Sequence, residues 1–169
     1  MLKSKTNPYN KNKSNNCFFL VDIISIKIKE DNGLFLYFHL MIRENEIAKH
    51  IVNAAYNVHV ELGPGLLESS YEACLIYELK RIGLKVMSQV NLPLIYKAVY
   101  LECGYRIDIL VEDSVIVELK CVSELHAIHI AQTITYLKLS KCKLALLINF
   151  NETRIKNGIK RLVNGYLEE

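Results

Sequence analysis

Three charged residues with the potential to do chemistry lie in a short segment that is otherwise largely apolar. Asp108 is followed ten residues later by Glu118, and Lys120 comes two residues after that. Carboxylate oxygens are the ligands that Mg²⁺ prefers, and a neighbouring ammonium can stabilise developing negative charge. Burying such charges is costly unless they are paired or bound to a metal. A cation site would supply a reason for burying them, but from these residues alone a surface hairpin with ordinary solvated charges is the favoured interpretation.

The elements that must position these charges are two strands joined by a tight turn at Glu112-Asp113-Ser114. Side chains alternate between the two faces of a strand. Glu118 and Lys120 therefore share one face of the second strand, while Asp108 and Arg106 share a face of the first. The hairpin can bring two carboxylates and one ammonium to a single point in the sheet.

The pattern of apolar residues from position 44 onward predicts an α/β fold with the element order α-α-β-β-β-α-β-α. This order indicates a mixed sheet flanked by helices. Pro93 indicates an edge strand or a bulge in the first strand. We expect helices over 44–62, 66–82, 124–139 and 155–166, and strands over 85–96, 105–111, 115–120 and 143–150. The helix over 124–139 is expected to align Leu125, Ile128, Ala131, Gln132, Thr135 and Leu139 near one face.

The first 43 residues differ in character from the rest, and we interpret them as an extension preceding a domain at 44–169. Residues 1–16 are polar, basic and low in complexity, which predicts disorder. Alternating residues at 22–29 and 34–38 indicate a hairpin around Asp31-Asn32-Gly33. No apolar run reaches the ~18 residues of a membrane span, so a membrane-associated role is a weak alternative. We hypothesise that Met41 is the true initiator or that residues 1–40 are a dispensable appendage; the alternative is that the segments at 22–29 and 34–38 add strands to a sheet edge.

Several motifs, in a fixed order, resemble a known family. The segment Gly65-Leu-Leu-Glu68-Ser-Ser-Tyr71 matches the motif of the GxxExxY proteins. The resemblance covers residues 46–150 and also includes Glu61-Leu-Gly-Pro-Gly, Asp108, Glu118-Leu-Lys120, Gln132-x-x-x-Tyr136 and Leu147-Ile-Asn-Phe150. The family is assigned to the PD-(D/E)xK nuclease superfamily. The resemblance therefore implies a restriction-endonuclease-like core and phosphodiester hydrolysis.

Hydrolysis of a phosphodiester needs a hard cation that holds a phosphate oxygen and a water. Asp108, Glu118 and the backbone carbonyl of Leu119 are the predicted ligands, with Mg²⁺ as the expected ion and Mn²⁺ as a substitute. Lys120 is expected to position the water or help to deprotonate it, and to stabilise negative charge. The resemblance implies that Glu68 approaches the metal; stabilisation of the helix N-terminus is the alternative.

Two further groups of residues have possible roles near this site. Gln132 and Tyr136 lie at i and i+4 on one helical face, and the resemblance implies that they orient the water or the substrate. A buried Tyr with a Gln partner is the alternative. Tyr71 is interpreted as structural or as a phosphate contact. His129 and Arg106 are further candidates for binding substrate. His126 lies three residues before His129, but zinc is not expected, since no third His or Cys ligand is evident nearby.

The amino-acid composition bears on the cellular compartment and on the binding partners. The five cysteines form no CxxC pair, which favours reduced thiols in a cytoplasm. The net charge of +3 neither opposes nor requires nucleic-acid binding. The sequence thus predicts a cytoplasmic, Mg²⁺-dependent nuclease acting on nucleic acid, DNA in preference to RNA, without a membrane partner. The rival is a protein of the same fold that binds nucleic acid or another partner without cutting. The oligomeric state is left open.

Overall fold

A computed structural model of the chain describes residues 32–165, with side chains described for residues 43–101 and 104–165. The chain divides into two units, Met1–Ile42 and Arg43–Glu169, and the second holds the sheet. The elements in chain order are α2 (Asn32–Leu62), α3 (Glu68–Arg81), β1 (Val86–Tyr96), β2 (Val99–Val111), β3 (Val115–Lys120), α4 (Ala127–Ser140), β4 (Leu144–Asn149), α5 (Ile155–Gly158) and β5 (Ile159–Val163). The α/β fold with a mixed sheet flanked by helices is as predicted.

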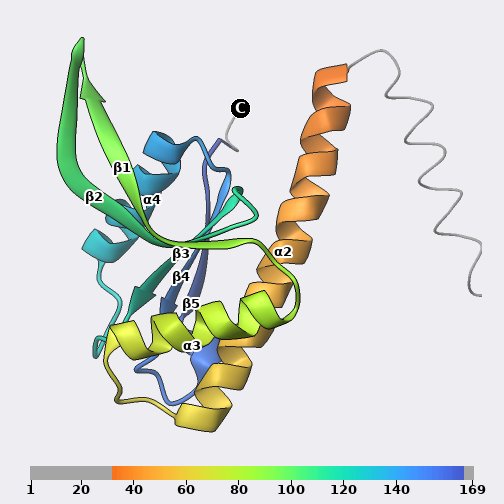
Figure 1. Cartoon of the computed structure of the whole chain (residues 1–169), viewed down its shortest axis with the longest axis vertical. Coiled ribbons are helices and arrows are strands. Elements are labelled where there is room, and N and C mark those ends of the chain that lie inside the picture. Colours follow the sequence, from red (N-terminus) through yellow and green to blue (C-terminus); the bar gives the residue numbers. More distant parts are fainter. Residues whose placement is uncertain (1–31, 166–169) are drawn as a thin grey trace, which may run out of the picture. The chain divides into compact units, whose positions relative to one another are not determined.

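The five strands form one sheet in the order β1-β2-β3-β4-β5 (Figure 1). Neighbouring strands are antiparallel, except that β3 and β4 are parallel and are connected through α4. A parallel pair needs a crossover of this kind. All six residues of β4 are buried, because the strand lies inside the sheet with helices on both faces.

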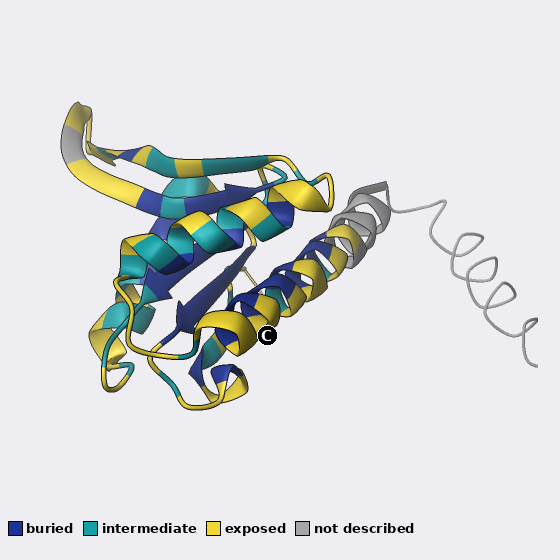
Figure 2. Ribbon diagram, turned by 60° about the horizontal axis from the view of Figure 1, so that its bottom comes forward, coloured by how far each residue is buried: buried dark blue, intermediate teal, exposed yellow. Residues whose placement is uncertain are grey.

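Helices cover both faces of the sheet and create two core clusters. The first joins α2 and α3 to one face, and the second joins α4 to the other. Figure 2 shows the buried stripe along α2 and the buried inner side of α3. Five apolar residues that recur at helical spacing along α2 are buried: Ile47, Ile51, Ala54, Ala55 and Val58.

The end of the chain corrects one prediction. A helix over 155–166 is wrong: α5 is a single turn that ends at Gly158, and Ile159–Val163 form β5. β5 pairs antiparallel with β4, from Ile148↔Ile159 to Leu144↔Val163. β4 would otherwise present an unpaired apolar edge, and covering that edge outweighs the local helical spacing.

Two other local predictions are also corrected. The strand expected over 34–38 is wrong, because these residues belong to α2; a short apolar run fits either element by periodicity. Residues 22–29 lie outside the described part of the chain. On α4 the buried residues are Thr133, Tyr136 and Leu137, whereas Ile128 is 68% exposed. Packing of the two larger side chains against the sheet sets the helix phase, and it differs from the predicted face.

The interpretation of Pro93 is confirmed. β1 is an edge strand, and its register with β2 shifts between Leu92 and Leu94. Proline cannot donate to the ladder, so it is accommodated at such an irregularity. Within residues 32–165, none of the helices has an apolar stretch long enough to cross a lipid bilayer.

Candidate active site

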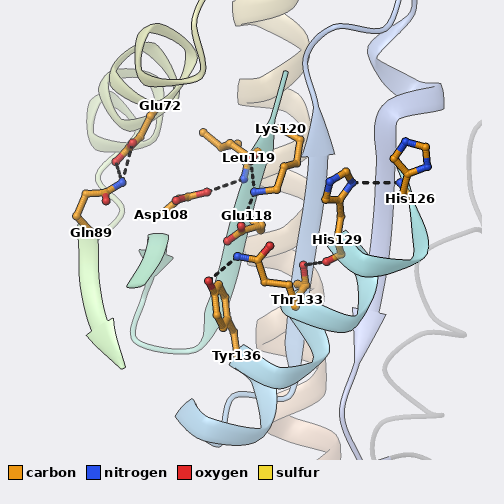
Figure 3. Close-up of polar contacts among 11 residues, drawn as sticks. Glu72, Gln89, Asp108, Glu118, Leu119, Lys120, His126, His129, Thr133 and Tyr136 are labelled. Carbon is orange, nitrogen blue, oxygen red and sulfur yellow. Dashed lines mark hydrogen bonds and ion pairs between the residues drawn. The ribbon is translucent and has the colours of Figure 1, made fainter. Parts of the chain in front are cut away.

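The structure brings Asp108, Glu118 and Lys120 together on the adjacent strands β2 and β3, as the sequence predicts (Figure 3). The Asp108 carboxylate accepts a hydrogen bond from the Leu119 backbone N–H at 2.9 Å. The Lys120 ammonium donates to Glu118 Oε1 at 2.5 Å and to the Leu119 carbonyl at 2.9 Å. A positive charge therefore lies against two of the oxygens that were predicted to bind a metal.

Glu118 is a buried carboxylate whose hydrogen bonding is incomplete. Its residue is 2% exposed, and its Oε2 atom has no hydrogen-bond partner. Burial and then the neighbouring Asp108 raise the pKa of Glu118 to about 7, although the bond to Lys120 opposes this. A buried carboxylate oxygen without a partner is unfavourable in water-excluded surroundings. The group would be satisfied by a cation, or by a proton.

The pKa of Lys120 also indicates an excess of negative charge at this site. Burial lowers its pKa, but the hydrogen bond to Glu118 and the charges of Glu118, Glu68 and Asp108 outweigh burial, so the pKa rises. Three carboxylates thus share one ammonium. Opposite charges nearby favour the charged form of a lysine, and the same imbalance makes the site attractive to a further cation.

Glu68 opens α3 and belongs to this charge cluster. It is the first residue of the helix, where a carboxylate is favoured by the helix dipole. Burial raises its pKa most; Asp108 raises it further, while Lys120 lowers it. The Glu68 carboxyl is therefore close enough to the hairpin for the charges of Asp108 and Lys120 to shift its pKa. Both interpretations of this residue, helix stabilisation and a contribution to the site, fit its position.

The donors fit a hard cation. Asp108, Glu118 and the Leu119 carbonyl offer oxygen ligands, which Mg²⁺ and Mn²⁺ accept, and Glu118 Oε2 is buried without a partner. Among the residues that the structure describes, no three His, Cys, Asp or Glu side chains form a metal-binding group, so a cation here would rely on two carboxylates and the Leu119 carbonyl.

Gln132 and Tyr136 face the same cluster from α4. Gln132 Nε2 donates to the Tyr136 hydroxyl at 2.6 Å (Figure 3). Burial raises the pKa of Tyr136, and Glu118 and Asp108 add to the rise, which shows that the hydroxyl lies within range of the carboxylates. The ring also meets Tyr105 edge-on, with centroids 6.3 Å apart. The pair is therefore both a buried hydrogen bond and a boundary of the site.

Tyr71 is placed in the core and away from any surface. It is fully buried, and its ring stacks on Phe150 at 4.4 Å. Its hydroxyl donates to the Gly63 carbonyl at 2.5 Å and accepts from the Leu66 N–H at 3.1 Å. Gly63 and Gly65 both have positive φ, which glycine adopts most easily. The geometry favours the structural interpretation of Tyr71, in which it fixes this glycine loop before α3.

The other two candidate substrate-binding residues are His129 and Arg106. His129 Nδ1 accepts from the His126 backbone N–H at 3.1 Å, and the His129 N–H donates to the His126 carbonyl at 3.0 Å. The two residues together cap the start of α4. Arg106 is exposed and pairs across the ladder with Asn91. Contacts of His129 and Arg106 with a substrate stay predictions.

Two polar groups near the site were given no role on the basis of the sequence. Gln89 has φ of 53° and donates to both carboxylate oxygens of Glu72, at 2.9 and 2.8 Å. The ladder places Gln89 between Ser88↔Ile109 and Val90↔Ile107, and therefore beside Asp108. No sequence signal links a helix carboxylate to a strand amide seventeen residues later.

Asn149 is the second such group. It is fully buried at the end of β4. Its amide donates to the Val122 carbonyl at 2.8 Å and accepts from the Val122 N–H at 3.1 Å. This clamp fixes the chain directly after Lys120. The signal was present, since an amide interrupts an otherwise apolar buried strand and needs partners there.

Comparison with known proteins gives one match. The family model described as the PD-(D/E)XK nuclease superfamily matches residues 45–162, which is more than half of the chain. Neither the curated proteins nor the solved structures contain a match to this chain. The matched range spans α3, the β2–β3 hairpin and the parallel strand β4.

Proposed function

Since the chain belongs to the PD-(D/E)XK nuclease superfamily, we propose that it is a metal-dependent nuclease that hydrolyses phosphodiester bonds. The nuclease domain is residues 44–169, and residues 1–43 are an extension to it. Within the superfamily we assign the chain to the GxxExxY group, on Gly65, Glu68 and Tyr71 of the motif. DNA is the favoured substrate over RNA.

The observation that carries the proposal is the buried, unpartnered Oε2 of Glu118 beside Asp108. Asp108, Glu118 and the Leu119 carbonyl are the oxygens that would hold Mg²⁺ or Mn²⁺. When bound, the ion supplies Lewis-acid polarisation of a phosphate oxygen. A purely structural ion pair would not need a second buried carboxylate oxygen without a partner.

The remaining residues act on charge and orientation. Lys120, whose pKa is raised, stays an ammonium at neutral pH; it stabilises the negative charge that grows on the phosphate as water adds to phosphorus. The bond from phosphorus to the leaving oxygen then breaks, and that oxygen takes a proton. Gln132 and Tyr136, already joined by a hydrogen bond, orient the water or the substrate, and Glu68 supports the site from α3.

A second candidate is a binding protein of the same fold without turnover. It is supported by the Lys120 ammonium, which already bridges Glu118 and the Leu119 carbonyl. A lysine in this position can neutralise the carboxylate without any metal. In this case the site would clamp nucleic acid and leave it intact.

The test is cleavage of labelled single- and double-stranded DNA and RNA by the full chain while Mg²⁺ or Mn²⁺ is titrated. We expect metal-dependent cleavage that Asp108→Ala or Glu118→Ala abolishes, because each removes a ligand. Glu124→Ala is the matched control, since Glu124 is exposed. Wild-type turnover in either site variant would contradict the assignment. Metal-independent binding without cleavage in any arm would support the second candidate.

If the protein binds nucleic acid, affinity should fall with salt because phosphate contacts release counterions. The net charge of +3 indicates few such contacts and hence a shallow slope. Tight binding that salt does not change would indicate a different class of ligand.

A further inference from the structure

The outer ends of β1 and β2 form an arm that extends beyond the rest of the sheet (Figure 1). We define the arm as residues 94–101, which include the turn at Lys97-Ala98. Its strands pair as Leu94↔Leu101, Ile95↔Tyr100 and Tyr96↔Val99. The register shift after Leu92 separates the arm from the regular sheet. No helix packs on it in the described structure, and Figure 2 shows it as mostly exposed.

The arm carries large apolar side chains that water surrounds. Five of its residues are between 37% and 66% exposed: Ile95, Tyr96, Val99, Tyr100 and Leu101. Cross-strand neighbours share a face of a ladder, and successive pairs alternate. The Ile95 and Tyr100 pair therefore occupies one face, and the Tyr96 and Val99 pair occupies the other. Both faces are apolar, unlike a solvated edge hairpin, in which one face is polar.

An exposed ribbon of this kind needs a partner. Two-stranded hairpins are marginally stable in water without packing, and contiguous exposed apolar surface on a soluble protein usually marks an interface. Lys97 is the one charged residue of the arm, and its ammonium lies 5.5 Å from the centre of the Tyr96 ring. Nucleic-acid affinity comes mainly from cations that contact phosphates. The arm therefore fits a protein better than a nucleic acid.

The exposed area is of the size that self-association needs. An aromatic side chain contributes on the order of 150–250 Å², so the five exposed side chains together with Tyr105 at the base, which is 40% exposed, offer on the order of 600 Å² per chain. If a second copy covers both faces of each arm, the two chains bury roughly 1,200 Å², the lower end of the range for stable complexes. β1 is also an edge strand, whose outer backbone groups are free to pair with another strand.

We propose that the arm is a dimerisation element that a second copy of this chain covers on both faces. The interface is isologous, so that the same residues meet their counterparts across a two-fold axis. The inference does not depend on nuclease activity, because it rests on the exposure and composition of residues 94–101 and Tyr105 and on the edge position of β1.

The test is sedimentation equilibrium of the full chain from 1 to 100 µM, for the wild type and for an Ile95→Glu/Tyr100→Glu variant. We expect a concentration-dependent dimer for the wild type and at least a tenfold rise in the dissociation constant for the variant. The control is Tyr56→Glu on α2, since Tyr56 is 58% exposed and Tyr100 61%. Circular dichroism checks that each variant is folded.

A second measurement on the wild type covers the case in which the variant fails to fold. Amide hydrogen exchange in residues 94–101 should slow as the concentration rises, while exchange in α3 stays constant. A wild type that is monomeric at 100 µM, a dimer that persists in the folded arm variant, or a dimer that Tyr56→Glu also dissociates would each overturn the proposal. A monomeric wild type whose arm variant loses binding to DNA would reassign the arm to nucleic acid.

Discussion

Replacing Glu118 by glutamine should stabilise the metal-free protein at alkaline pH. The substitution keeps the shape of the side chain and removes its charge. In the folded protein the pKa of Glu118 is about 7, against an ordinary value of 4.5, because the group is buried and lies beside Asp108. The folded state therefore holds this proton more tightly than the unfolded chain. The resulting stability is complete below about pH 4.5 and is lost as the pH rises through 7.

The magnitude follows from the gap between the two pKa values. One pKa unit corresponds to about 1.4 kcal/mol, so ionised Glu118 costs roughly 3 kcal/mol of stability at pH 8. Glutamine avoids this cost, but it weakens the contact with Lys120 because the carboxylate charge is lost. The Lys120 ammonium can still donate to the amide oxygen of the glutamine and to the Leu119 carbonyl. After that loss we expect Glu118→Gln to be more stable than the wild type by about 1–2 kcal/mol at pH 8, and nearly equal to it at pH 4.5.

The assay is urea unfolding in EDTA at several values between pH 4.5 and 8, followed by the same series with Mg²⁺. The difference between variant and wild type isolates Glu118 from all other titrating groups. Added Mg²⁺ should raise the stability of the wild type at pH 8 and leave Glu118→Gln unchanged, because the variant lacks the ligand. An exposed control, Glu124→Gln, should show neither effect. If the difference between Glu118→Gln and the wild type does not change with pH, the reasoning about burial is refuted.

Three further substitutions test individual contacts. Lys120→Ala should lower turnover by about 100-fold while metal affinity, measured by calorimetry, stays within error; normal turnover with weakened metal binding would contradict its role. Tyr71→Phe should destabilise by about 1–3 kcal/mol in urea unfolding, because the Gly63 carbonyl and the Leu66 N–H lose their partner; an unchanged midpoint would return Tyr71 to the substrate-binding candidates. Gly158→Ala should cost about 1–3 kcal/mol, since a Cβ atom there lies 2.3 Å from the Asn149 carbonyl oxygen, whereas Asn157→Ala, at an exposed position, should be neutral.

The sequence was sufficient for those features that depend on local period and spacing. The alternation of side chains along β2 and β3 predicted that Asp108, Glu118 and Lys120 would meet, and they do. The apolar period from residue 44 predicted a helix that ends at residue 62, and α2 ends at Leu62. Each of these depends on residues that are close in sequence.

The errors came from features that depend on distant partners. β5 exists because β4 has an edge to cover, and nothing within residues 159–163 indicates that edge. The contact between Gln89 and Glu72 requires α3 to lie against β1. The buried face of α4 is set by how Tyr136 and Leu137 meet the sheet. Single-sequence periodicity contains no information about such tertiary neighbours.

The parallel pairing of β3 with β4 also determines when the site is completed during synthesis. β1, β2 and β3 are consecutive antiparallel strands and can associate as soon as they leave the ribosome. Lys120 gains its neighbour Asn149 only after the whole of α4 has been translated, because a parallel partner requires that crossover. A nascent chain that stops before β4 therefore lacks the strand that buries Glu118 and the clamp that holds Val122. Prematurely terminated products would therefore lack the completed cluster of Asp108, Glu118 and Lys120.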